Sequence, residues 1–428
     1  MMKKIIISIT TLLIASVSIA EDISQFRGEG RKGVYSESGL LKTWGEGQPK
    51  LLWQLDNIGE GYLPPSVVDG KLYLSALDAD NKKEMLKVLD LNGKLLWELE
   101  YGNAWKGSYK NSRTMPNIVG DFAYMATGAG EVVCVDLKNK KIAWSVDAVK
   151  EYDGKPFNWG YGENVLVADN KVMFTVGGYK TALVAFDAMT GKELWKTKSF
   201  EQMATYVSPL LIEHNGKKQV VAAVAGNAFG VDLDNGEIIW QVLLERQTPE
   251  KKPKKPNDTT WGLWKISGAT PIYKDGKIFL TAGYDSGSLM LELPEAKGEV
   301  KVLWKNPTFD NHHGGIVLLD GKLYGANWNN NNSGNWQCVD WQTGETIYNQ
   351  EWEGFSKGSV VSADGLLYVY EEKRGEVALV NPKSDKFDII SSFTITDGKG
   401  PHWAHIVIAD KVMYIKRGEV LFAYDIKE

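Results

Sequence analysis

Cysteine is scarce in this chain, with two copies among 428 residues. Cys134 and Cys338 occupy the same place in two copies of a repeated phrase, each just before Val-Asp. Equivalent strands that lie far apart in a repeat array do not bring two Cα atoms within disulfide distance. We therefore expect both cysteines to be buried free thiols that pack as small apolar side chains.

Positive charge is also in short supply. The formal net charge is −5, and it falls to −7 without Lys3 and Lys4. Polyanions bind to proteins chiefly through lysine and arginine side chains that are present in excess. The composition therefore argues against a nucleic-acid partner and against binding to an anionic membrane surface.

Long apolar runs are missing except at the start. Residues 5–19 form an apolar run diluted by Ser and Thr that follows Lys3 and Lys4. The run ends in Ser18-Ile19-Ala20, which has small residues at both positions that signal peptidase reads. This arrangement is typical of a secretory signal peptide, and the run is short for a membrane-spanning helix. We expect residues 1–20 to be cleaved. No cysteine follows that could carry a lipid, so a periplasmic or secreted location is predicted.

What the chain has in abundance is one phrase. "AFDAMTGKELW" (Ala185–Trp195) returns as "GVDLDNGEIIW" (Gly230–Trp240) and "CVDLKNKKIAW" (Cys134–Trp144). A second phrase, "DGKLY", precedes it at Asp69–Tyr73 and in other copies. Each opens with turn residues and continues as an alternating apolar strand, so one unit of roughly 45–50 residues predicts a four-stranded antiparallel meander.

Eight such units are centred near Tyr73, Tyr124, Met173, Val221, Phe279, Tyr324, Tyr368 and Tyr414. The last unit lacks its final strand, whereas Pro49–Asp56 is a tryptophan-bearing strand without a unit. An N-terminal strand that completes the C-terminal blade closes a β-propeller and removes its free edges. We therefore predict an all-β, eight-bladed propeller over residues 48–428, preceded by a lead-in segment at residues 21–47.

The repeated phrase itself predicts structure rather than chemistry. Its aspartate can accept hydrogen bonds from turn amides, and its glycine permits a positive φ. Its tryptophan is expected to be buried between neighbouring blades. The predicted docking side chains are Trp53, Trp97, Trp144, Trp195 and Trp240.

The pattern A-x-D-x-x-x-G-x-x-x-W resembles the tryptophan-docking repeat of propellers of the pyrroloquinoline quinone (PQQ) type. Residues Gln25–Trp44 are similar to the lead-in of secreted bacterial proteins with PQQ-like repeats. The resemblance implies the fold for nearly the whole chain after residue 20. That superfamily contains quinoprotein alcohol dehydrogenases and also a non-catalytic lipoprotein that assists outer-membrane β-barrel assembly.

Loops that lead from the outer strand of one blade to the inner strand of the next gather on one face of a propeller. Such loops on a rigid scaffold commonly carry binding function. In this chain they hold aromatic, cationic and imidazole side chains, and we predict a ligand site at the channel mouth. Its candidate residues are Arg113, Trp159, Tyr161, Tyr206, Trp264, Asn311, His312, His313, Lys357, His402, Trp403 and His405.

The histidines of "NHHGG" and "HWAH" could bind a metal or act as a general base, but their spacing is no strong zinc pattern. We expect no metal there and favour hydrogen bonds to the backbone. The Asn-rich turn Asn327–Asn335 could offer oxygens to Ca²⁺, but a polar hairpin loop is favoured because it lacks carboxylates. The Lys- and Pro-rich stretch Glu245–Trp261 is expected to be a solvated excursion, with a docking arm as the alternative.

Three functions remain open at this point. The favoured one is a non-catalytic binding or scaffold propeller that acts as a monomer and takes a small ligand or a periplasmic protein partner. The second is a PQQ-dependent dehydrogenase. For such enzymes the resemblance implies adjacent cysteines against the cofactor, carboxylate and asparagine ligands for Ca²⁺ and an aspartate base. This chain has no adjacent cysteines and no C-x-x-C-H. The third is a glycan-binding propeller, because aromatic rims suit sugar rings.

Overall fold

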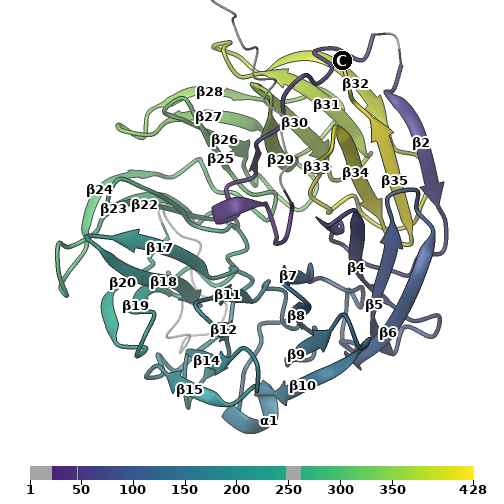
Figure 1. Ribbon diagram of the computed structural model, residues 1–428. Helices are drawn as coiled ribbons and strands as arrows, with labels where there is room; N and C mark the ends of the chain where they lie inside the picture. Colours follow the sequence, from purple (N-terminus) through teal and green to yellow (C-terminus); the bar gives the residue numbers. More distant parts are fainter. Residues whose placement is uncertain (1–21, 46, 247–261) are drawn as a thin grey trace, which may run out of the picture.

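The computed structural model describes residues 22–45, 47–246 and 262–428. Eight antiparallel four-stranded sheets stand around a central channel, which confirms the predicted eight-bladed β-propeller (Figure 1). In this part of the chain, helix is confined to a 3-10 turn, η1 (Glu29–Arg31), and one α-helical turn, α1 (Ala148–Tyr152). The predicted signal peptide and most of the Lys- and Pro-rich stretch lie outside the described residues.

Blades are numbered in chain order, and their strands run from the channel outwards. The first four blades are β3 (Ser66–Val68), β4 (Lys71–Leu77), β5 (Lys83–Asp90) and β6 (Leu95–Asn103); β7 (Asn117–Val119), β8 (Phe122–Ala126), β9 (Glu131–Asp136) and β10 (Lys141–Asp147); β11 (Leu166–Ala168), β12 (Lys171–Thr175), β14 (Leu183–Asp187) and β15 (Glu193–Lys196); and β17 (Leu210–His214), β18 (Lys217–Val224), β19 (Asn227–Asp232) and β20 (Ile238–Leu243). A small extra pair, β13 (Gly177–Gly178) and β16 (Gln202–Met203), lies beside the third blade in the sequence.

The last four blades are β21 (Ile272–Lys274), β22 (Lys277–Ala282), β23 (Gly287–Glu292) and β24 (Lys301–Asn306); β25 (Val317–Leu319), β26 (Lys322–Ala326), β27 (Trp336–Asp340) and β28 (Thr346–Gln350); β29 (Gly358–Ala363), β30 (Leu366–Glu371), β31 (Glu376–Asn381) and β32 (Asp388–Thr394); and β33 (Val407–Ala409), β34 (Val412–Arg417) and β35 (Val420–Asp425), completed by β2 (Lys50–Leu55).

The ring closes as the sequence predicted. Strand β2 pairs antiparallel with β35, from Lys50 opposite Asp425 to Leu55 opposite Leu421. The eighth blade thus takes its outer strand from the other end of the chain, and the sheet edge that the last repeat would leave open is covered.

The "DGK" turns explain how each blade begins. In the sixth blade Asp320 and Gly321 have φ values of 49° and 76°, and in the seventh Asp364 and Gly365 have 46° and 78°. Two successive residues with positive φ make the type I′ hairpin, whose twist matches that of the flanking strands. The turn therefore fixes the register of the two innermost strands.

Tryptophan and glycine of neighbouring blades form one packing unit. The indole Nε1 of Trp144 donates to the Ala188 carbonyl in the turn of the next blade, and Trp195 does the same to Leu233. A Cβ on Gly191 would lie 2.7 Å from the Trp144 ring. The glycine is therefore required both by its φ of 70° and by the indole that lies against it.

Trp144, Trp195 and Trp240 are buried as predicted, but Trp97 and Trp53 are only half-buried. In the turn beside Trp97, Lys140 stands in place of the glycine and still adopts a φ of 53°. The Lys140 ammonium stands 5.8 Å from the centre of the Trp97 ring, at cation–π distance.

The lead-in segment does more than precede the propeller. Strand β1 (Val34–Tyr35) adds in parallel to β29 at the inner edge of the seventh blade, and η1 lies near the centre of the ring (Figure 1). Ile23 pairs with Val67 of the first blade. Residues far apart around the ring are thus joined by one short segment.

Two buried arginines fasten this segment. Arg27 donates to the carbonyls of Ile316 and Val360, in the sixth and seventh blades. Arg31 donates to the carbonyls of Asn164 and Val165, at the entry to the third blade. Burial lowers the pKa of both guanidinium groups to about 10. The two arginines thereby link the lead-in segment to the third, sixth and seventh blades.

Both cysteines are buried and unpaired, Cys134 in the second blade and Cys338 in the sixth. Among the described residues, no helix has the length and apolar character needed to cross a membrane.

Candidate ligand site at the channel mouth

A cavity of about 530 Å³ opens at one end of the channel. Its wall comes from loops of all eight blades, and Phe26 of the lead-in segment contributes to it as well. Phe26 also packs edge-to-face on His405, with ring centres 4.9 Å apart. Because the lead-in segment occupies the channel beside the cavity, the cavity opens at the mouth and does not continue through the ring.

Two kinds of loop supply the lining. The loops that enter an inner strand carry Arg113, Trp159, Tyr206, His313 and Trp403, as the repeat predicts. The loops between the second and third strands of a blade emerge on the same face and also contribute, namely Tyr284 of the fifth blade, Asn331 and Asn332 of the sixth, and Glu372 and Lys373 of the seventh.

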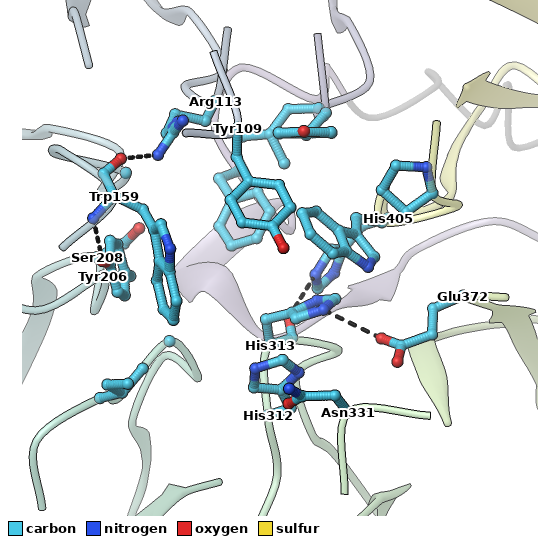
Figure 2. A pocket seen from close by; sticks show the side chains of 18 of the residues that line it. Tyr109, Arg113, Trp159, Tyr206, Ser208, His312, His313, Asn331, Glu372 and His405 are labelled. Atoms are coloured by element: carbon cyan, nitrogen blue, oxygen red, sulfur yellow. Dashed lines mark hydrogen bonds and ion pairs between the residues drawn. The ribbon is translucent and has the colours of Figure 1, made fainter. Parts of the chain in front are cut away.

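The upper wall is a nearly continuous series of ring contacts (Figure 2). Trp159 stacks on Tyr206 with ring centres 6.0 Å apart, and Tyr109 touches Trp159 at 6.2 Å and Trp403 at 5.4 Å. Tyr62 also contacts Trp403, with ring centres 5.1 Å apart. Such a wall offers flat apolar faces with hydroxyl groups at their edges.

The series continues through imidazoles. His313 lies 5.4 Å from the Trp403 ring and 4.5 Å from His312, whose ring is in turn 5.0 Å from Tyr284. Trp328 ends the series beside Tyr284 at 4.7 Å. Sequence-distant loops therefore hold one another in place across the mouth.

Arg113 brings a cation into this aromatic wall. Its Nη1 donates to the Trp159 carbonyl and its Nε donates to Asn111. Its Nη2 is buried and has no hydrogen-bond partner, and burial lowers the pKa of the group. An unpaired buried donor is costly, so a ligand acceptor at this place would be stabilised.

Trp159 is held from two sides. Its backbone N–H donates to the Tyr206 hydroxyl at 3.1 Å, while its carbonyl accepts from Arg113. Deeper in, the Ser208 hydroxyl accepts from the backbone and side-chain nitrogens of Asn164, at 2.9 and 3.1 Å. The loops that enter the second, third and fourth blades thereby fix this part of the wall before any ligand binds.

A buried charge pair lies on the opposite wall. Lys357 Nζ is 2.7 Å from Glu372 Oε1. His313 Nε2 is 3.1 Å from Glu372 Oε2 (Figure 2). The His313 contact lacks the alignment of a hydrogen bond. Burial alone would raise the pKa of Glu372, but His313 and Lys357 outweigh it and lower that pKa to about 2. The carboxylate is therefore ionised at neutral pH.

His405 is fixed as a neutral ring. Arg27 Nη1 can only donate, so the His405 Nδ1 atom 3.0 Å away must accept. Nε2 then carries the proton and donates to the His313 carbonyl, also at 3.0 Å. Burial and the adjacent guanidinium hold the pKa of His405 well below its usual range. Both nitrogens are committed, so His405 positions its neighbours and is not arranged as a base.

Seven of the twelve predicted ligand residues line the cavity: Arg113, Trp159, Tyr206, His312, His313, Trp403 and His405. Lys357 is fully buried behind the wall, where it neutralises Glu372. The remaining four are held in the framework: Tyr161 donates to Val176, Trp264 to Glu245 and Asn311 to Ala326, and His402 bonds the Tyr370 hydroxyl.

The Asn-rich turn forms a hairpin whose amides bond one another. Asn329 donates to Asn335, Asn330 donates to Ser333 and Asn331 accepts from Trp328. The side-chain oxygens of Asn327, Asn330, Asn331 and Asn335 thus accept hydrogen bonds from within the turn. The turn also reaches the cavity through Asn331 and Asn332, which sequence reasoning missed.

A family model described as "Outer membrane protein assembly factor BamB", built on the PQQ-type repeat, matches residues 82–347. The chain belongs to this family. The curated proteins that are similar to this chain include both quinoprotein dehydrogenases and a BamB.

Among curated relatives, the chain is similar to the quinoprotein alcohol dehydrogenase PedH of Pseudomonas putida, with 28% identity over 233 residues, or 48% of this chain. It spans only 36% of that enzyme's length. A solved BamB from Moraxella catarrhalis superposes with a TM-score of 0.62 at 12% identity, covering 88% of this chain and 99% of that one. A europium-containing methanol dehydrogenase gives 0.64 at 12% identity, covering 93% and 90%. At such identities these structures show the fold alone.

Proposed function

We propose that this protein is an exported PQQ-repeat propeller that binds a small anionic or polyhydroxylated ligand at its channel mouth without turning it over. The observation that carries the proposal is the unpaired, buried Nη2 of Arg113 in a wall of aromatic rings. A guanidinium group recognises a carboxylate or an array of hydroxyl groups, while tryptophan and tyrosine faces stack on the apolar face of the same molecule.

The shape of the cavity supports a small molecule. A volume of about 530 Å³ is in the range of sites for single small ligands. The lead-in segment occupies the channel next to it, so a long glycan would have to leave through the mouth. A sugar acid combines the carboxylate, the hydroxyl groups and the stacking face, and is the probe class of choice.

The dehydrogenases among the relatives imply PQQ with Ca²⁺ or a lanthanide. The metal half of that requirement does not fit these residues. Ca²⁺ takes roughly six to eight oxygen ligands. The cluster of His312, His313 and Glu372 offers two imidazoles and one carboxylate, and this carboxylate already pairs with Lys357. Four amide oxygens of the Asn-rich turn accept hydrogen bonds from their own hairpin. No redox step is therefore assigned to this cavity.

Binding can be measured by thermal shift and tryptophan fluorescence with a panel of sugar acids and the matching neutral sugars. We expect an acid to raise the melting temperature of the wild type. Arg113→Lys keeps the charge but loses the planar fork, so it should weaken the acid selectively. A parallel assay supplies PQQ, Ca²⁺ and a redox dye with a primary alcohol. Dye reduction that requires both additions would overturn the proposal in favour of a dehydrogenase.

Export is the other part of the proposal, and it rests on the sequence of residues 1–20. Cell fractionation of the full chain and of a chain starting at Glu21 should place the first outside the cytoplasm and the second inside. Equal distribution of the two would contradict export through this segment.

A further inference from the structure

We propose that His312, His313 and Glu372 form a binding site for a divalent transition-metal ion such as Zn²⁺, open on the cavity side. One ligand atom from each of the three residues lies within 4.8 Å of the other two. This juxtaposition joins the loop before β25 to the loop between β30 and β31. The sequence gives no sign of this juxtaposition because His313 and Glu372 are 59 positions apart.

Each of the two histidines has one ring nitrogen that makes no hydrogen bond and could bind a metal ion. His312 Nε2 lies 3.0 Å from the Tyr284 hydroxyl, and its Nδ1 is buried without a partner. Metal-binding histidines are usually oriented in this way, with the second ring nitrogen held by an outer hydrogen bond. His313 Nε2, although close to Glu372, has no aligned hydrogen bond either.

Glu372 supplies the negative charge. Its Oε1 is held by Lys357 at 2.7 Å, which fixes the carboxylate and leaves Oε2 directed to His313. A carboxylate whose outer oxygen is tied to a neighbouring group is a common arrangement around metal ions. The ammonium of Lys357 also repels a second cation, so we expect the affinity to be moderate.

The donor set selects the kind of ion. Two imidazoles and one carboxylate suit Zn²⁺ and its neighbours in the first transition row, and they do not suit Ca²⁺. Three protein ligands leave at least one coordination position free. Because His312, His313 and Glu372 all line the cavity, that position faces the space in which a ligand would lie. A bound ion would then add a Lewis-acid contact for a carboxylate or a hydroxyl group.

The test uses the metal alone, so that its outcome is independent of the ligand proposed above. Metal-free protein is titrated with Co²⁺, and the visible absorption of the ion in a nitrogen and oxygen site is followed; Zn²⁺ and Ca²⁺ then compete. We expect one equivalent of Co²⁺, displacement by Zn²⁺ and none by Ca²⁺. An equal displacement by Ca²⁺, or no Co²⁺ spectrum at all, would overturn the proposal.

Variants locate the site. His313→Ala and Glu372→Gln should each weaken Co²⁺ binding by at least about 10-fold, the lower end of what even outer-shell changes cost. His214→Ala, which removes a histidine of the fourth blade that contacts Tyr273 and Pro294, is the matched control and should bind as the wild type does. Unchanged binding in both cavity variants would sink the assignment. Circular dichroism checks the fold of each variant, and the wild-type spectrum remains decisive if one fails to fold.

Discussion

At the scale of the residue, the indole of one blade and the turn of the next act as a pair. Trp195 is 6% exposed, and its Nε1 donates to Leu233 of the fourth blade. We expect Trp195→Ala to lower the free energy of unfolding by about 3–5 kcal/mol, because a large aromatic site between two sheets is emptied. Trp97→Ala is the control and should cost clearly less, since Trp97 is half-buried beside Lys140. Denaturant unfolding measures both, and equal losses would contradict the pairing.

The glycine of the pair can be tested separately. Gly191 and Gly321 have φ values of 70° and 76°, so an alanine strains the backbone at both. A Cβ at Gly191 would meet the Trp144 ring at 2.7 Å, whereas nothing lies within 4 Å at Gly321. Gly191→Ala should therefore lower the melting temperature more than Gly321→Ala. If the two shifts are the same, the indole is not held against the turn.

Glu163 gives a prediction for pH. It is buried, its Oε2 has no hydrogen-bond partner, and burial raises its pKa from about 4.5 to about 8. The folded state therefore holds this proton more tightly than the unfolded state does. The contribution of this proton to the free energy of unfolding is complete below pH 4.5 and is lost as the pH rises toward 8. Unfolding free energies measured from pH 5 to 8 should decline less for Glu163→Gln than for the wild type. Parallel profiles would show that Glu163 does not titrate in this range.

At the scale of the element, the closing strand is the part whose loss the ring tolerates least. A chain that starts at Asn57 lacks β2 and exposes the outer edge of β35, whereas a chain that starts at Gln48 keeps this strand and lacks only the lead-in segment. We expect the first deletion to lower the melting temperature much more than the second, because an open blade leaves ladder groups and the apolar wedge uncovered. Scanning calorimetry compares them with the chain that starts at Glu21. A smaller loss for the shorter chain would contradict closure by β2.

The blades could be predicted from sequence because their signals are local. The "DGK" turn, the alternating strands and the Asp-to-Trp phrase all lie within one repeat, and the missing last strand could be matched to Pro49–Asp56. The same logic placed the inter-blade loops on one face. It did not reveal that the loops within blades share this face, although the antiparallel order of the strands requires it.

The rest of the site depends on contacts that no spacing encodes. Glu372 meets His313 only because the sixth and seventh blades are neighbours in the ring. The lead-in segment contains no repeat, so nothing in its sequence showed that Arg27 and Arg31 would be buried in the channel. Lys357 was predicted as a ligand residue because it is a cation in the right kind of loop. The buried carboxylate that it neutralises explains its actual place behind the wall.

At the scale of the whole molecule, the positions and reactivity of the two cysteines test the arrangement of the blades. Cys134 and Cys338 lie in the second and sixth of eight blades, on opposite sides of the channel. Both are buried, and burial raises their pKa values to about 12 and 11, so neither is a thiolate at neutral pH. We expect no linked peptide pair in mass spectrometry of the non-reduced protein and no alkylation of either thiol in the native state.

Their exposure also tests whether the ring unfolds as a unit. The sheet of each blade packs on the sheets of its two neighbours, and closure by β2 leaves no free end from which blades could peel away. We therefore expect both thiols to become reactive at the same denaturant concentration in the closed ring. In the chain that starts at Asn57 the ring is open between its eighth and first blades. Cys134 lies nearer to this gap than Cys338 and should react at the lower concentration. Separate thresholds in the closed ring would mean that its halves unfold independently and that closure does not couple them.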